Sequence, residues 1–135
     1  LTWLSQTGHS WSADKEFADR GWWLWRVRWH KDEAYGFAYN RKQNAIHLYS
    51  GNPRSNFHLI QPFALSLKQH KKGYPNESDL IFDHDNAFAI VRRDADSYTA
   101  QLGHSVFPYK KWTWIGFGLY ISMPVVRSIN TNFSL

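Results

Sequence analysis

Residues 50–57 read Ser50-Gly51-Asn52-Pro53-Arg54-Ser55-Asn56-Phe57, a run of turn-forming residues that ends in an aromatic side chain. Two other segments have the same form: residues 4–11 end at Trp11, and residues 105–112 end at Trp112. The spacing from Trp11 to Phe57 and from Phe57 to Trp112 is 46 and 55 residues. Self-similarity at such a spacing indicates a repeated structural unit.

Strand-like runs flank each of these turns. They are rich in β-branched and aromatic residues and are bounded by turn formers. In the first complete unit they are residues 24–30, 34–39, 45–49 and 57–60, and in the second residues 78–82, 87–92, 98–102 and 112–115. The pattern predicts two four-stranded antiparallel meanders, over residues 22–62 and 75–116. We expect residues 1–21 to end an earlier unit and residues 119–135 to begin a later one, with a strand at 120–127.

The predicted fold class is all-β, with consecutive four-stranded blades of a β-propeller that has about six blades in its closed ring and is incomplete in this chain. The one short helix candidate, residues 64–72, falls where two blades connect. A plain antiparallel sandwich, with turns that resemble one another by coincidence, is the alternative. An open run of blades leaves strand edges unpaired, which predicts self-association of the chain.

The composition narrows the class of protein. The 135-residue chain is 43% hydrophobic and 18% aromatic, which excludes an intrinsically disordered protein. No apolar run approaches the roughly 18 residues of a transmembrane helix, so a folded, soluble chain without a membrane partner is expected. There is no cysteine, and the histidines lie apart without metal-ligand spacing, so neither a metal nor any other cofactor is expected. The net charge of +5 comes from scattered basic residues, and no nucleic-acid partner is predicted.

The three turns resemble the Asp box, Ser-x-Asp-x-Gly-x-x-Trp or Phe, of sialidases and related BNR-repeat β-propellers. Each copy keeps the final aromatic residue; the first also keeps Gly8, the second Ser50 and the third Ser105, and none has the aspartate. The resemblance implies that these turns are structural, with short polar side chains bonded to the backbone and the aromatic residue packed between sheets. It also suggests a secreted or periplasmic protein. Leu1 is not an initiator methionine and no signal peptide follows it, so the sequence is expected to begin inside a longer chain.

A second resemblance to sialidases lies at Asn76-Glu77 and at the run Ala89-Ile90-Val91-Arg92-Arg93-Asp94. In that family an Asn-Glu pair opens the first strand of a blade, and an apolar strand ending in Arg follows about sixteen residues later. The resemblance implies that Glu77 polarises a tyrosine nucleophile and that Arg93 is one of three arginines that bind the substrate carboxylate. It implies a glycoside hydrolase of the exo-alpha-sialidase type, with an acidic, sialic acid-like glycan as partner. The family also needs an Asp general acid, a Tyr nucleophile and two further arginines, spread over about six blades. This chain supplies at most one or two of the arginines and the glutamate, so the chain alone is expected to be inactive.

The antiparallel topology supports part of this site independently. The start of the first strand of a meander lies beside the end of its second strand, so Glu77 and Arg93 are expected to face each other at one rim. The same rule brings Arg26 close to Tyr39 in the preceding meander, and the loop that contains Tyr74 enters the same rim. Because a one-residue shift in register exchanges the two faces of a strand, Arg92 is the alternative partner of Glu77. Arg, unlike Lys, binds a carboxylate bidentately.

Structural interpretations of the same residues stay open. Glu77 and Arg93 can be an ion pair at the end of a blade, and Arg26 and Arg28 can lie over the aromatic residues with which they alternate. Three functions are therefore compatible with the sequence: part of a sialidase-like hydrolase, a non-catalytic glycan-binding propeller, and a propeller used for protein contacts.

Overall fold

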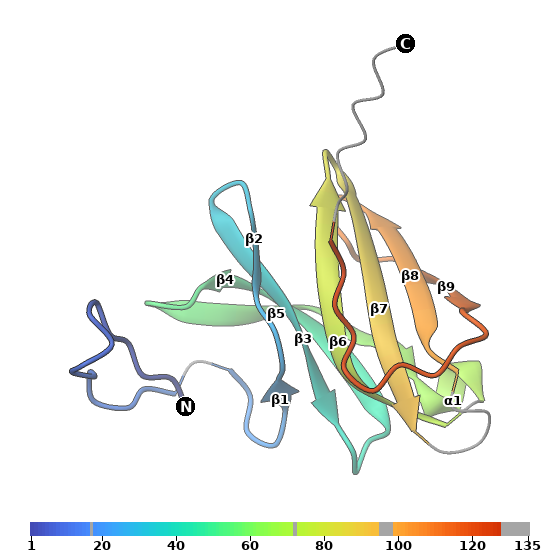
Figure 1. The fold of residues 1–135 in the computed structure, drawn as a ribbon, viewed down its shortest axis with the longest axis horizontal. Helices are drawn as coiled ribbons and strands as arrows, with labels where there is room; N and C mark the ends of the chain where they lie inside the picture. The colour runs from blue at the N-terminus through green and yellow to red at the C-terminus, as the bar shows by residue number, and fades with distance from the viewer. Residues whose placement is uncertain (17, 72, 95–98, 128–135) are drawn as a thin grey trace.

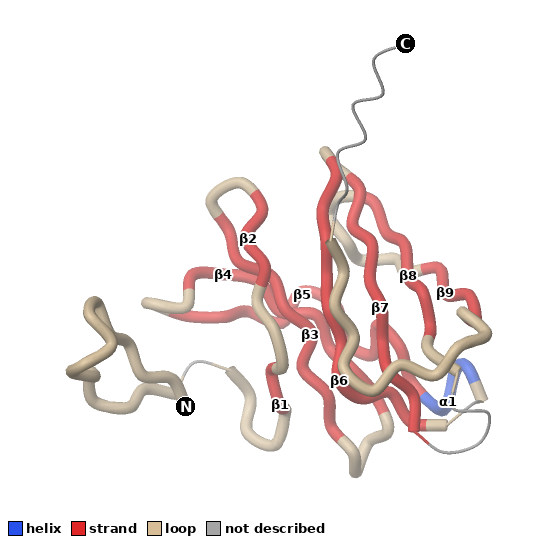
Figure 2. Tube along the Cα trace, in the orientation of Figure 1, coloured by secondary structure: helices blue, strands red, loops and turns tan. Residues whose placement is uncertain are grey.

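A computed structural model describes residues 1–16, 18–71, 73–94 and 99–127 of the chain, which form two antiparallel sheets (Figures 1 and 2). The strands of the first sheet are β1 (Trp23–Leu24), β2 (Arg28–His30), β3 (Glu33–Asn40), β4 (Ala45–Asn52) and β5 (Asn56–Ser66). They are ordered β1-β3-β4-β5, and β2 also pairs with β3. The second sheet has the order β6-β7-β8-β9, formed by β6 (Tyr74–Asp83), β7 (Asn86–Asp94), β8 (Gln101–Val106) and β9 (Thr113–Gly116).

The all-β class and the two antiparallel meanders are therefore confirmed, whereas closure into a propeller remains a prediction because the described strands form two open sheets. The short helix candidate is one turn, α1 (Leu67–His70), because residues 64–66 still belong to β5. Within the described ranges, no helix has the length and apolar character needed to span a membrane.

The first strand of the first meander is broken, contrary to the continuous strand predicted at residues 24–30. It consists of β1 and β2, with residues 25–27 outside the ladder. The cause is a close approach: a Cβ atom on Gly36 in β3 would lie 2.6 Å from the carbonyl oxygen of Arg26. The chain at Arg26 therefore passes directly over β3, which only glycine permits.

Both ends of the predicted repeat differ from expectation. Residues 120–127 form no strand; this segment crosses the second sheet beside β6 and β7 (Figure 1). We call residues 117–127 the strap. In the described part of residues 1–21 the only β pairing is an isolated bridge between Thr2 and Lys15. Trp11, the expected aromatic anchor there, is 63% exposed, so it packs no sheet interface.

The other two turns are structural, as expected from the Asp-box resemblance. The Asn52 side chain accepts a hydrogen bond from the backbone N–H of Arg54 at 2.9 Å, and the Ser105 hydroxyl donates to the Lys111 carbonyl at 2.6 Å. Phe57 is buried on the outer face of the first sheet, and Trp112 packs against Phe37 with ring centroids 5.1 Å apart. Trp112 therefore packs between the sheets as expected, whereas the same expectation is wrong for Phe57, which packs with Ala38 and Tyr49 away from the second sheet.

The core lies between the two sheets. Tyr35, Phe37, Ile46 and Leu48 of the first sheet pack against apolar residues of the second, among them Leu80, Ala89 and Val91. At the far edge, the Trp114 indole donates a hydrogen bond of 2.7 Å to the carbonyl of Ala64 in β5. Trp114 lies flat over Gly103, where a Cβ would come within 2.4 Å of its ring. The sheets are joined by aromatic packing, by this hydrogen bond and by an ion pair between Arg28 in β2 and Asp79 in β6.

Candidate functional site

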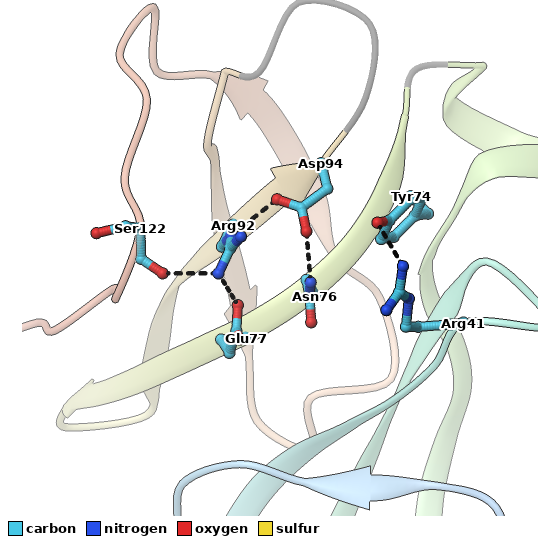
Figure 3. Close-up of polar contacts among 7 residues, drawn as sticks. All are labelled: Arg41, Tyr74, Asn76, Glu77, Arg92, Asp94 and Ser122. Carbon is cyan, nitrogen blue, oxygen red and sulfur yellow. Dashed lines mark hydrogen bonds and ion pairs between the residues drawn. The ribbon is translucent and has the colours of Figure 1, made fainter.

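The predicted rim contains a network of hydrogen bonds centred on Arg92 (Figure 3). Arg92 Nη1 donates to Glu77 Oε2 at 2.8 Å, and Arg92 Nε donates to Asp94 Oδ1 at 2.7 Å. The other carboxylate oxygen of Asp94 accepts from Asn76 Nδ2 at 2.7 Å. Arg92 Nη1 also reaches the carbonyl of Ser122 in the strap, at 3.1 Å. We call Asn76, Glu77, Arg92 and Asp94 the rim cluster.

A bulge in the strand pairing selects Arg92 as the partner of Glu77. In the β6–β7 ladder Pro75 pairs with Arg93 and Ser78 pairs with Val91, so Asn76 and Glu77 together lie opposite the single residue between them. Two residues opposite one is the geometry of a β-bulge, which redirects side chains locally. Glu77 thereby meets Arg92.

The predicted pairing of Glu77 with Arg93 is wrong. Successive side chains of a strand point to opposite faces, so Arg93 lies on the face that carries Val91, toward the first sheet. Arg93 is only 2% exposed and donates from Nη2 to the carbonyl of Gly73 at 3.1 Å. It is a structural residue within the sheet packing, and it is not accessible to a substrate.

Tyr39 and Tyr74 do lie at this rim. Burial raises the pKa of Tyr39, and the charge of Glu77 raises it further against the lowering effects of Arg41 and Arg92. Tyr39 therefore stays protonated at neutral pH and is a hydrogen-bond donor. The hydroxyl of Tyr74 accepts from Arg41 Nη2 at 3.0 Å (Figure 3).

An exposed indole extends the rim beyond Tyr39. Trp23 is the register partner of Tyr39 across β1 and β3, and their rings are nearly parallel, 13° apart with centroids separated by 6.4 Å. Trp23 is 63% exposed and also lines a cavity of about 420 Å³ together with Trp22 and Asp19. The Asp19 carboxylate is oriented by a 2.7 Å hydrogen bond from the Tyr49 hydroxyl.

Arg26 does not join the rim cluster in the described structure. Its backbone covers Gly36, and its Nε is buried without a hydrogen-bond partner among the described residues. The interpretation in which Arg26 and Arg28 share one face of a strand also fails, because the strand is broken between them. Arg28 instead forms a bidentate pair with Asp79 of the second sheet, at 2.8 and 2.6 Å.

The electrostatics of the rim cluster limit its chemistry. Burial lowers the pKa of Arg92, but Asp94 and Glu77 raise it more, so the pKa lies above its usual range. Two carboxylates flank one guanidinium, which leaves a formal charge of −1 on the cluster. A carboxylate from a ligand would have to displace Glu77 or Asp94 from Arg92.

Sequence reasoning missed three members of this surface: Trp23, Arg41 and Asp94. Asp94 was visible as the residue after Arg93, and Arg41 follows the same strand end as Tyr39. No sequence feature marked Trp23 as a site residue, because its position beside Tyr39 follows from the break between β1 and β2. Among the residues that the structure describes, no group of three or more His, Cys, Asp and Glu side chains could hold a metal ion.

Comparison of the chain with protein-family models, with curated proteins and with solved structures gives no match.

Proposed function

We propose that this chain is a two-sheet segment of a sialidase-like β-propeller whose rim binds a glycan without hydrolysing it. The observation that carries the proposal is the state of Arg92, whose guanidinium already binds Glu77 and Asp94. An arginine held in this way positions two carboxylate acceptors and is poorly suited to receive a third carboxylate. Fixed acceptors of this kind suit the hydroxyl groups of a sugar.

The aromatic surroundings support the same ligand class. Trp23 offers a flat, exposed ring that lies nearly parallel to the neighbouring ring of Tyr39. Such a ring buries the apolar face of a sugar at little cost in side-chain entropy. Arg41 and Tyr74 supply a further guanidinium and ring on the neighbouring side of the rim cluster.

Hydrolysis of an acidic sugar is the second candidate, and one contact favours it. Tyr39 interacts electrostatically with Glu77, which resembles the pairing of a glutamate with a tyrosine nucleophile in sialidases. Against this role, Glu77 Oε2 already accepts a hydrogen bond from Arg92, which makes the carboxylate a weaker base toward Tyr39. We therefore propose binding, with neutral glycans preferred over acidic ones.

The test is a glycan-binding assay on the whole chain, with neutral and sialylated glycans in parallel, together with an assay for release of the aryl group from an aryl sialoside. Trp23→Ala is expected to weaken neutral-glycan binding about tenfold or more, since stacking on an aromatic residue contributes of the order of 1–3 kcal/mol in comparable ring contacts. Trp11→Ala is the matched control, because Trp11 is equally exposed at 63% and lies away from the rim cluster. Equal binding by Trp23→Ala and the wild-type chain would overturn the assignment.

A second variant separates binding from hydrolysis. Glu77→Gln removes one of the two carboxylates that occupy Arg92 and is expected to increase affinity for sialylated glycans relative to neutral ones. Aryl sialoside turnover by the wild-type chain that falls with Glu77→Gln would instead establish the hydrolase and end the binding-only proposal.

A further inference from the structure

A second cavity, of about 440 Å³, lies at the other end of β6 from the rim cluster. Leu80, Ile81 and Phe82 line it from β6, whereas the rim cluster begins at Asn76. Its other walls come from β2 and from the end of the strap (Figure 1). The polar groups that line it are Arg28, His30 and Arg127.

Arg28 is the best ordered of these groups. Asp79 holds its guanidinium bidentately, through Nε at 2.8 Å and Nη2 at 2.6 Å. Asp79 also accepts the backbone N–H groups of Leu80 and Val126, at 2.9 and 3.0 Å, so its acceptor capacity is used inside the protein. Arg28 Nη1 makes no hydrogen bond within the described ranges, and the side chain is 38% exposed.

His30 adds an unsatisfied nitrogen to the same cavity. Its ring stacks on Phe82, with centroids 4.6 Å apart and planes 15° apart, and this fixes the direction of the imidazole. The Nε2 atom is buried and has no hydrogen-bond partner in the described part of the chain. Buried polar atoms are almost always hydrogen-bonded, because leaving one unpaired costs free energy. A ligand atom that bonded His30 Nε2 would therefore remove this cost.

Arg127 completes a positive site. The hydrogen bond from the Val126 N–H to Asp79 fixes the strap at the cavity, and the next residue is Arg127. Its side chain is exposed and forms no ion pair with the described residues. Arg28 and Arg127 against Asp79 give this cavity a formal charge of +1, opposite in sign to the rim cluster.

We propose that this cavity binds an oxyanion, as the phosphate, sulfate or carboxylate group of a small organic ligand. A guanidinium fork with free donors matches such groups in shape and charge, and a second guanidinium and an imidazole nitrogen are available on the same cavity wall. The volume exceeds that of a bare ion and falls in the range of small-molecule sites. The β6 residues Leu80, Ile81 and Phe82 line the cavity and supply an apolar wall for the organic part. This site is independent of the proposed glycan-binding rim.

The test is an NMR titration of the ¹⁵N-labelled full chain with inorganic phosphate, sulfate, acetate and glucuronate, at ionic strength held constant with sodium chloride. Saturable shifts are expected at the Val126 and Leu80 amides, which both donate to Asp79 beside Arg28. Arg127→Ala and His30→Phe are each expected to weaken binding about tenfold, the effect of losing one charge-assisted or buried hydrogen bond. His30→Phe retains the ring that stacks on Phe82, and Arg127 forms no ion pair with the residues that the structure describes, so both variants are expected to fold.

Arg54→Ala is the control, because it removes the same charge from the distant β4–β5 turn. The absence of saturable shifts with all four anions, or equal weakening by Arg54→Ala, would overturn the proposal. Tighter binding of phosphate and sulfate than of the carboxylates would identify a phosphorylated or sulfated ligand. Tighter binding of glucuronate than of acetate would identify an organic carboxylate whose ring contacts the apolar β6 wall of the cavity.

Discussion

The ion pair between Arg28 and Asp79 offers a direct measure of how strongly the two sheets are held together. The Asp79 carboxylate is fully buried and accepts four hydrogen bonds, two from Arg28 and two from backbone N–H groups. Asp79→Asn keeps the shape of the side chain but removes its charge and places N–H groups against donors. Breaking a buried ion pair by changing one partner costs about 3–5 kcal/mol. Because Arg28 is 38% exposed and can be rehydrated, we expect a loss near the lower limit, about 3 kcal/mol.

Urea denaturation at pH 7, followed by tryptophan fluorescence, measures this loss as a change in the free energy of unfolding. The control is Asp85→Asn, which removes an exposed ion pair between Lys31 and Asp85 that also joins the two sheets. Exposed pairs contribute about 0–1 kcal/mol, so the control should remain close to the wild type. A loss for Asp79→Asn that is no larger than for the control would refute the claim that this pair joins the sheets.

The pH dependence gives the same test a second form. Burial raises the pKa of Asp79, but the hydrogen bonds from Arg28 and from two backbone N–H groups outweigh this effect, so the pKa lies below its usual range. The carboxylate therefore contributes stability that is present above the unfolded-state pKa of about 3.9 and is lost as the pH falls through the lower folded-state pKa. Asp79→Asn should remove this part of the acid dependence.

Three further predictions concern stability and assembly. Burial lowers the pKa of His47, which stacks on Trp22, to about 4, despite the opposing charge of Asp19. The free energy of unfolding should therefore fall by about 3 kcal/mol as the pH decreases from 7 to 4. His47→Phe should remove most of this pH dependence, as measured by urea denaturation across this range. Trp112→Ala should lower the free energy of unfolding by about 3 kcal/mol, since this indole packs against the core and donates a hydrogen bond to a carbonyl. A loss under about 1 kcal/mol would show that Trp112 does not hold the two sheets together. The isolated chain should self-associate through the outer face of the second sheet, where Ile115 is 61% exposed. Light scattering should show less association for Ile115→Lys than for the wild-type chain. A stable monomer of the wild-type chain would contradict this prediction.

Much of the strand arrangement could be predicted, because it depends on local sequence. The strands β3, β4 and β7 combine β-forming residues with turn formers at both ends, and their predicted ranges overlap the observed ones. The break after β1 could not be predicted, since it arises from contact between Arg26, which lies outside the ladder, and Gly36 in β3. Residues 120–127 have a strand-like composition, yet a strand also needs a partner, and no described residue pairs with them.

The location of the candidate site was predicted correctly, but the arginine that pairs with Glu77 was not. The antiparallel rule correctly brought the start of β6 to the end of β7, which is why Glu77 lies beside an arginine. Which arginine faces it depends on the bulge at Asn76 and Glu77, and one extra residue in a ladder leaves no mark in composition or periodicity. The same limit applies to Asp79, whose partner Arg28 is 51 residues away in sequence.

The hydrogen bond from Trp114 to Ala64 turns one indole into a local reporter of sheet separation. It connects β9 and β5, the last strands of their respective sheets, whereas the hydrogen bonds of each ladder lie within one sheet. If the sheets swing apart while each stays intact, this indole proton should exchange with solvent before the amide protons of β4 and β7 do. Coincident exchange of all three would mean that the two sheets open only when the whole chain unfolds. A single proton thus distinguishes a hinged pair of sheets from one cooperative unit.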